Sequence, residues 1–300
     1  MGKKNNRRKM VKLAVLICVK DRPSEIALLL QSLRTQTFQD FDVYILDDKS
    51  GTPLNRYHFF NCIVTRIKSE GHRIFLKQTE FPHGVSRARQ AIVELAMKKG
   101  DYDYFLRVDD DVVLEPDYIE RLFKVINFGY DIASGVTVPM QMPVFRREPK
   151  YLKGIVNRVI LDEEGNYIMN GDDCGYGYTE SVILPAHHFR SCALIKKEVH
   201  EKVKYYPTRL SKHGFREEQI FSYNAQMIGF KIGVDTGAIN YHQMTPSGGE
   251  RFPDQQDLTK FNQKILVEFT KQHKDELNKL FTHENMPTEL ELKKEIMITF

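Results

Sequence analysis

Short apolar runs alternate with amphipathic segments along the first half of the chain. The runs at residues 12–19 and 41–46 carry almost no polar interruption, as strands buried on both faces of a parallel sheet require. After the first run, apolar residues recur with the spacing of one face of a helix, at Ile26, Leu29, Leu30 and Leu33. This alternation of strand and helix predicts a parallel sheet that is covered by helices.

The same alternation continues to about residue 138 and then fades. Further strands are predicted at 73–77, 104–108 and 131–138, and helices around 60–67 and from Gly84 to Gly100. Gly, Asp and Asn gather over 163–177, which predicts an inserted loop or a small hairpin over the site. Asp172 and Asp173 in this segment favour a turn over a metal site. Regularity returns with strands at 189–195, 231–234 and 238–241, helices at 196–203 and 215–228, and a long amphipathic helix at 254–281.

Composition describes an ordinary globular protein of one large domain, or of one domain with an appendage. The 300 residues are 41% hydrophobic and 28% charged, and no apolar run approaches the ~18 residues that a membrane span needs. The four cysteines, Cys18, Cys62, Cys174 and Cys192, are far apart without a CxxC pair, so we expect reduced, mostly structural thiols and a cytoplasmic location. The net charge is only +4. Positive residues crowd residues 1–12, which favours a disordered solubilising arm over a site for nucleic acid or anionic lipid.

Carboxylates follow three of the predicted strands. Asp21 comes after the first strand, Asp47 and Asp48 after the second, and Asp109, Asp110 and Asp111 after the strand at 104–108. Ligands bind at the carboxyl ends of strands in open α/β sheets, so these side chains are placed to hold a divalent cation and, through it, a phosphate. If the strand continued, Asp109 and Asp111 would address one ligand while Asp110 pointed away. The alternative is a solvated acidic turn.

Other polar residues could complete such a site. His242 could be a further ligand if the metal is manganese, although an isolated histidine is more often structural. Asp48 could accept a hydrogen bond from a base N–H. Arg87 and Arg89, where a helix begins, could meet phosphate oxygens together with the helix amides. Arg251 lies in a Gly-containing loop that is suited to ordering over a bound phosphate.

Glu217 and Glu218 remain for proton transfer. Moving a sugar onto a hydroxyl without a covalent intermediate requires a carboxylate that takes the proton of the acceptor. The alternative is that both residues only stabilise a helix N-terminus by their charge. The residues alone do not decide which of the two glutamates would be the base.

The order of these pieces resembles the family 2 glycosyltransferases, which have the A-type nucleotide-sugar fold. The resemblance covers about residues 12–242. It rests on VKDRP, SLRTQTFQDFDVYILDDKS, GVSRARQAIVELA, YFLRVDDDVVLEPDYIERL, ALIKKEV and FREEQIFSYNAQMIGFKI, which occur in this order and spacing. It implies an α/β, GT-A-like fold: a Rossmann-like, mostly parallel central sheet flanked by helices, here with a C-terminal helical extension.

The resemblance also implies roles for individual residues. Asp109 and Asp111 would be the DxD pair, with Asp111 the direct metal ligand, and His242 would bind the metal too. The nucleotide would contact Val19, Lys20, Asp21, Arg22, Asp48, Arg87, Asp109, Asp110 and Arg251. The base would belong to the Glu217–Glu218 pair. The family usually has Glu-Asp there, and matching the second member makes Glu218 the first choice. Lys20-Asp21 replaces the Tyr-Asn pair that the family usually has after the first strand. This difference bears on which nucleobase the donor carries.

The leading hypothesis is a metal-dependent, inverting glycosyltransferase that uses Mn²⁺ or Mg²⁺ and a UDP-sugar. A nucleotidyltransferase and a catalytically silent nucleotide-sugar-binding protein are the alternatives. The acceptor could be a saccharide, glycolipid, protein, wall polymer or modified nucleic acid. His187, His188, Arg190, Tyr176 and Tyr178 either border the acceptor site or pack in the interior.

These assignments also divide the chain into segments. We expect a basic tail at 1–11, a nucleotide-binding half at 12–138, an acceptor half at 139–250, and a helical extension at 251–300. The extension packs on the body or on a partner, where it could support a homo-oligomer.

Overall fold

The computed structural model describes residues 12–141, 145–147, 155–170, 176–178, 181–205, 210–249 and 255–281. The strands are β1 (Leu13–Val19), β2 (Phe41–Asp47), β3 (Ile74–Gln78), β4 (Tyr104–Asp109), β5 (Val112–Leu114), β6 (Ile132–Pro139), β7 (Phe145–Arg147), β8 (Val159–Leu161), β9 (Tyr167–Asn170), β10 (Tyr176–Tyr178), β11 (Ile183–Pro185), β12 (Ala193–Lys196) and β13 (Ile232–His242). The helices are α1 (Pro23–Arg34), α2 (His58–Ser69), α3 (Val85–Lys99), α4 (Tyr118–Asn127), α5 (Lys197–Lys202), α6 (Glu217–Met227), α7 (Gln255–Gln272) and α8 (Lys274–Phe281), with a short 3₁₀ helix, η1, at Leu54–Arg56.

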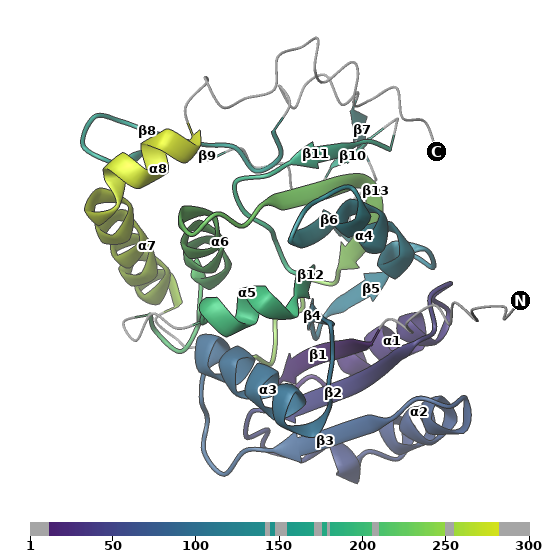
Figure 1. Cartoon of the computed structure of the whole chain (residues 1–300). Coiled ribbons are helices and arrows are strands. Elements are labelled where there is room, and N and C mark those ends of the chain that lie inside the picture. The colour runs from purple at the N-terminus through teal and green to yellow at the C-terminus, as the bar shows by residue number, and fades with distance from the viewer. Residues whose placement is uncertain are drawn as a thin grey trace, which may run out of the picture.

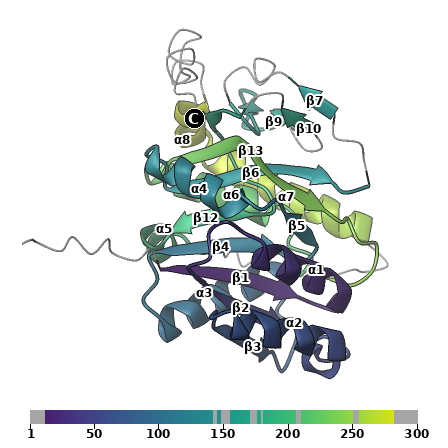
Figure 2. The ribbon, with the colours of Figure 1, turned by 90° about the vertical axis from the view of Figure 1, so that its right-hand side faces the viewer.

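One large sheet runs through the molecule (Figures 1 and 2). Its strand order among the described residues is β11-β13-β6-β12-β4-β1-β2-β3, and β5 pairs with β13. The β1, β2, β3 and β4 pairings are parallel, as is β6 with β13. The prediction of a mostly parallel sheet is therefore confirmed. Antiparallel pairing enters where β12 lies between β4 and β6, and where β5 and β11 pair with β13.

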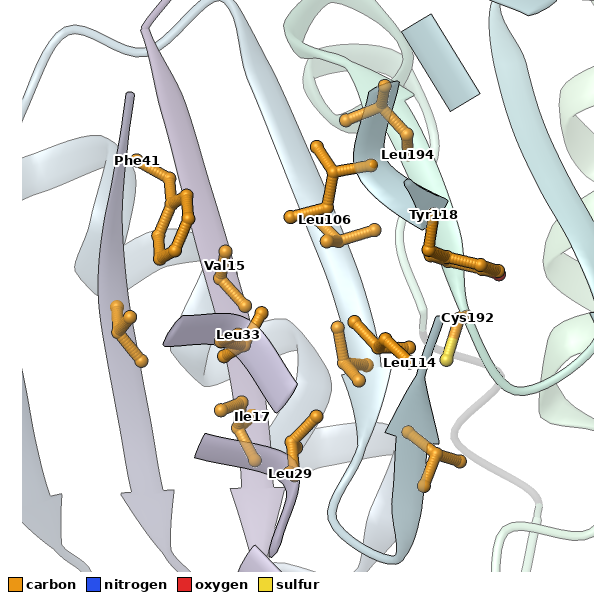
Figure 3. Close-up of a cluster of buried hydrophobic side chains, with 14 of the residues drawn as sticks. Val15, Ile17, Leu29, Leu33, Phe41, Leu106, Leu114, Tyr118, Cys192 and Leu194 are labelled. Carbon is orange, nitrogen blue, oxygen red and sulfur yellow. The ribbon is translucent and has the colours of Figure 1, made fainter. Parts of the chain in front are cut away.

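Helices cover both faces of the sheet. On one face, Ala88 and Ile92 of α3, Val199 of α5 and Phe221 of α6 pack in a single apolar cluster with strand residues. The opposite face is covered by α1, α2 and α4. Figure 3 shows its side chains, among them Leu29 and Leu33 of α1 and Tyr118 of α4, against Val15 and Leu106 of the strands. The two-sided burial explains why β1 and β4 are almost continuously apolar.

Two strands differ from the pattern-based prediction. No strand was predicted between the acidic residues 109–111 and α4, but β5 lies there and pairs with the end of β13, with Val112 opposite His242. Val112 and Leu114 are buried, so this short apolar run gains more from sheet pairing than from joining the helix. The two short strands expected at 231–241 form the single strand β13, whose pairing register with β6 shifts between Val234 and Ile239.

The predicted small hairpin in the irregular region is present, because β8 and β9 pair antiparallel. Strands β7 and β10 form a separate two-stranded parallel sheet. Asp172 and Asp173, and the basic tail at 1–11, lie outside the described residues.

The C-terminal segment forms two helices rather than the single helix predicted. α7 and α8 are separated at His273, and α8 packs against α6 and β8. Its Leu277 and Phe281 are buried in a third apolar cluster with Ile220 and Tyr223 of α6. In the described residues 255–281, α8 therefore packs on the body of its own chain, and a homo-oligomer through this extension stays a prediction.

Two expectations from composition concern cysteines and membranes. Cys18, Cys62 and Cys192 are free thiols, and Cys174 lies outside the described residues. None of the helices in the described part of the chain has the length and apolar character to cross a bilayer.

Truncating Leu277 in α8 should destabilise the whole protein. The side chain is fully buried, so Leu277→Ala should lower the free energy of unfolding by about 2–5 kcal/mol. Leu28→Ala is the matched control, because Leu28 is also helical but 51% exposed, and its effect should stay below about 1 kcal/mol. Urea unfolding followed by circular dichroism measures both. Equal losses would mean that α8 is not part of the cooperative core.

Candidate functional site

A pocket of about 200 Å³ opens at the carboxyl ends of β1 and β4, beside the N-terminus of α3. Nine of the predicted site residues line it: Val19, Lys20, Arg22, Asp48, Arg89, Asp109, Asp110, Asp111 and His242. Cys18, Val85, Ala88, His213 and Gly249 complete the lining. Carboxylates from two of the three acidic strand ends, Asp48 and Asp109 to Asp111, thus meet at one cavity, whereas Asp21 does not line it.

Some predicted residues lie elsewhere. Asp21, Arg87, Glu217 and Glu218 are not among the residues that line the pocket, and Arg251 lies outside the described residues. Arg87 is exposed on α3, whereas Arg89, two residues on, is buried and faces the pocket. Arg89 therefore occupies the place in which phosphate-binding arginines were expected.

Asp110 does not point away from the site. Strand β4 ends at Asp109, and Asp110 and Asp111 form a turn. The alternation of side chains between the two faces of a strand therefore does not extend to Asp110 and Asp111. Nη1 of Arg22 lies 2.8 Å from Oδ1 of Asp110 and 3.0 Å from Oδ2 of Asp111. Burial raises the pKa of Asp110 to about 7; the neighbouring Asp111 charge adds to this and Arg22 opposes it.

Asp111 also contacts His242, through its other carboxylate oxygen. Oδ1 of Asp111 lies 3.0 Å from Nε2 of His242. Burial acts to lower the pKa of His242, but the contact with Asp111 outweighs it and the pKa is raised. The pairing of β5 with the end of β13 fixes this contact, since Val112 is opposite His242.

These donors fit a divalent cation that brings its own additional ligands. A carboxylate oxygen and an imidazole nitrogen suit manganese, and the carboxylate suits magnesium. Within the described residues, no group of three or more His, Cys, Asp or Glu side chains converges to hold a metal. Oxygen atoms from a diphosphate and from water would therefore have to complete the coordination around Asp111.

Asp109 belongs to a second charge cluster. Its carboxylate contacts Arg89, and Nη2 of Arg107 lies 3.9 Å away. The same arginines hold Glu217, with Nε of Arg89 at 2.9 Å and Nη2 of Arg107 at 2.6 Å from Oε1. Burial acts to raise the pKa of Asp109, but Arg89 and Arg107 lower it to about 2. Arg107 was not foreseen as a site residue, since it sits within an apolar strand.

The two glutamates at the start of α6 have different surroundings. Glu217 is only 1% exposed and is enclosed by Arg89 and Arg107; its burial raises its pKa to about 7, against the effect of both arginines. Glu218 is partly exposed, and its carboxylate makes no ion pair within the part of the chain described. Access to an incoming hydroxyl therefore favours Glu218.

Asp48 shapes a loop beside the pocket. Its carboxylate accepts hydrogen bonds from the backbone N–H groups of His83 (2.8 Å) and Gly84 (2.9 Å) and from Oγ1 of Thr79 (3.2 Å). Asp21 acts in the same way, because its Oδ1 accepts the N–H of Gly51 at 2.7 Å. Both residues thus organise loops at the strand ends, and Asp48 does so while facing the pocket.

Residues 243–249 lie across the loop that follows β1. The N–H of Gly249 donates to the carbonyl of Lys20 at 2.7 Å, and Nε of Arg22 donates to the carbonyl of Ser247 at 3.2 Å. Gly248 has a φ of 72°, and a Cβ there would lie 2.6 Å from both Cγ of Arg22 and the carbonyl oxygen of Asp21. The close approach of the two loops therefore requires glycine at this position. Figure 2 shows the segment after β13 running past α1.

The candidate acceptor histidines are interior residues. Nδ1 of His187 accepts the N–H of Val159 at 2.8 Å, and its ring stacks on Phe281. His188 is 1% exposed, and burial lowers the pKa of both histidines, that of His187 to about 4. The packing alternative therefore holds for these two. The structure does not describe the side chains of Tyr176 and Tyr178. Arg190 is partly exposed.

His213 is a pocket residue that sequence reasoning missed. It stands in the loop before α6, whose Lys212 carbonyl accepts the N–H of Val85 at the start of α3. In the sequence, the only sign that His213 belongs to the pocket was its position a few residues before Glu217 and Glu218.

The sequence was then compared with known families. The model of glycosyl transferase family 2 matches residues 14–203 of the 300. The chain belongs to this family. No curated protein matches the chain.

Solved structures share the fold at low sequence identity. Residues 1–349 of S. aureus TarS in complex with UDP-GlcNAc are 14% identical, with a TM-score of 0.58 over 87% of this chain and 66% of that one. GalNAc-T7 with UDP, GalNAc and Mn²⁺ is 14% identical, with a TM-score of 0.60 over 81% of this chain and 45% of that one. The match to a longer S. aureus TarS chain covers only 37% of that chain. These likenesses confirm the expected GT-A-like fold.

Neutralising Asp109 should cost stability in a pH-dependent way. Its pKa of about 2 lies below the ordinary value of 3.8, so its ion pairs stabilise the fold above pH 4 and are lost as the pH falls towards 2. Asp109→Asn should lower the free energy of unfolding by about 2 kcal/mol at pH 6 and by about 1 kcal/mol at pH 3.

Chemical unfolding at both pH values checks this. Asp257→Asn is the control, because its side chain is 77% exposed and should change stability by less than about 0.5 kcal/mol at either pH. A loss for Asp109→Asn that is as large at pH 3 as at pH 6 would contradict the ion-pair account.

Proposed function

We propose that this protein transfers a sugar from a UDP-sugar to an acceptor hydroxyl, with inversion at the sugar and with the help of a divalent cation. The observation that carries the proposal is the contact of Asp111 with His242 in the lining of a pocket on the carboxyl ends of β1 and β4. Family membership supports sugar transfer. UDP is favoured because both TarS and GalNAc-T7 were solved with uridine nucleotides.

The donor would lie in the pocket with its diphosphate towards the acidic turn. Asp111 and His242 would hold Mn²⁺ or Mg²⁺, which when bound stabilises the charge of the departing diphosphate. The part of the pocket that Val19 and Asp48 line would receive the nucleoside, and Asp48 holds the loop beside it in place.

Glu218 would be the general base. It is the accessible member of the pair at the start of α6, and it would take the proton of the acceptor hydroxyl as that oxygen attacks the sugar. Glu217 would remain in its ion pairs with Arg89 and Arg107, which fix the beginning of α6 relative to β4.

Two other functions would use the same pocket. A nucleotidyltransferase would direct its nucleophile at the α-phosphate and would depend little on Glu218. A silent member would bind the nucleotide-sugar without consuming it. The acceptor class remains open among saccharide, glycolipid, protein, wall polymer and modified nucleic acid.

Calorimetry should show metal-dependent binding of one nucleoside diphosphate. UDP, titrated with Mn²⁺ present, should bind at least about tenfold more tightly than with chelator, and GDP and dTDP should bind more weakly than UDP. Asp111→Asn should remove the metal dependence, because it deletes the charge that holds the cation. Asp257→Asn, exposed on α7, serves as the control. No metal-dependent binding of any of the three would refute a diphosphate site at the acidic turn.

Removing the proposed base should separate binding from turnover. Glu218→Gln should leave UDP binding unchanged and slow UDP release from UDP-sugars by roughly a hundredfold to ten-thousandfold, measured with water or a screened hydroxyl acceptor. Glu198→Gln on the exposed face of α5 is the control. Unchanged UDP release by Glu218→Gln would shift the base to Glu217. Release of a sugar phosphate in place of UDP would indicate a nucleotidyltransferase, because attack at the α-phosphate frees that group, and wild-type protein that binds UDP-sugars but consumes none would indicate a silent member.

A further inference from the structure

Arg22 connects the acidic turn to the loop at residues 243–249. It is 8% exposed, and its Nη1 contacts the carboxylates of Asp110 and Asp111. Nε donates to the carbonyl of Ser247, and Nη2 lies 3.4 Å from the carbonyl of Thr245. One guanidinium group thus bridges two carboxylates and two backbone carbonyls, which its planar fork of donors makes possible.

Further contacts keep the loop against Arg22. The N–H of Gly249 donates to the carbonyl of Lys20, and the N–H of Gln243 donates to the carbonyl of Asp111 at 2.8 Å. Gly248 and Gly249 have φ values of 72° and 65°, and a Cβ on either would lie within 3.3 Å of Arg22 side-chain atoms. The loop is therefore shaped to the arginine side chain.

Arg22 and a divalent cation would compete for the same carboxylate. Oδ2 of Asp111 is 3.0 Å from Nη1 of Arg22, and Oδ1 is 3.0 Å from His242. A cation on Asp111 would stand a few ångströms from the guanidinium, and two positive charges at that separation repel strongly in a buried site. This repulsion would push the guanidinium away. The carbonyls of Thr245 and Ser247 would then lose their contacts with Arg22.

We propose that Arg22 is a positioning residue that neutralises the acidic turn while no cation is bound, and that cation binding at Asp111 loosens the 243–249 loop from Arg22. Metal binding and loop attachment then oppose each other, and each weakens the other by the same factor. The inference rests on the metal site of the proposed function but not on sugar transfer.

Two measurements on Mn²⁺ alone, without nucleotide or acceptor, test the coupling. Hydrogen exchange reports on the amides of Gln243 and Gly249, and calorimetry reports on Mn²⁺ affinity. In wild type, Mn²⁺ should speed exchange at these amides by roughly threefold or more. Arg22→Gln should bind Mn²⁺ about tenfold more tightly, because a nearby positive charge is gone, and should exchange fast with or without the ion.

Three variants separate the contributions. Arg22→Lys keeps the charge but loses the fork, so it should bind Mn²⁺ like wild type while its loop exchanges faster. Asp111→Asn should abolish the response of the loop to Mn²⁺. Arg66→Gln, in which an arginine that is 64% exposed on α2 is neutralised, should behave as wild type in both measurements. Circular dichroism verifies that each variant is folded.

Several outcomes would overturn the proposal. Mn²⁺ affinity that is unchanged or weaker in Arg22→Gln would mean that Arg22 does not compete with the cation. Unchanged exchange of the wild-type loop on adding Mn²⁺ would mean that the loop is not coupled to Asp111. If neither wild type nor Arg22→Gln binds Mn²⁺, there is no cation site at Asp111 and the proposal fails. If UDP-sugars are bound but never consumed, only the catalytic part of the proposed function fails and the coupling stands.

Discussion

Charge compensation at the end of β4 is the constraint on which the site depends. Asp109, Asp110, Asp111 and Glu217 bring four carboxylates together, and Arg22, Arg89 and Arg107 supply three guanidinium groups. Burial raises the pKa of Asp110 and of Glu217 to about 7, and the contact with Asp111 raises the pKa of His242. Buried charges persist only when paired, so these groups hold one another in position.

The paired groups come from separate parts of the chain, and their attraction brings those parts together. Arg22 stands before α1, Arg89 on α3, Arg107 on β4 and Glu217 at the start of α6. This network, made of one cluster around Arg22 and another around Glu217, joins these parts of the chain at the end of β4 and fixes the pocket wall without relying on the loops alone. It also sets the two glutamates apart: Glu217 is held inside the network, whereas Glu218, the next residue, stays accessible.

Local patterns predicted the sheet, the order of its helices and most of the pocket lining, because strand ends in such a sheet must converge. They failed where distant residues decide. Asp110 turns inward because β4 stops at Asp109, and β5 exists because β13, more than 100 residues later, offers it an edge. Arg107 lies in an apolar strand, and nothing nearby in sequence shows that its partner is Glu217. His187 and His188 belong to the interior only because α8 and α6 cover them.

The continuity of the central sheet limits how the molecule can move. β12 hydrogen-bonds to β4 on one side and to β6 on the other, and β5, which follows the acidic turn, pairs with β13. Residues 12–138 and the strands that follow them are thus joined by backbone ladders, and a hinge between them would have to break hydrogen bonds across the sheet. Opening and closing around a ligand therefore falls to peripheral segments, while the ion pairs of Glu217 with Arg89 and Arg107 hold the start of α6 to the strand ends.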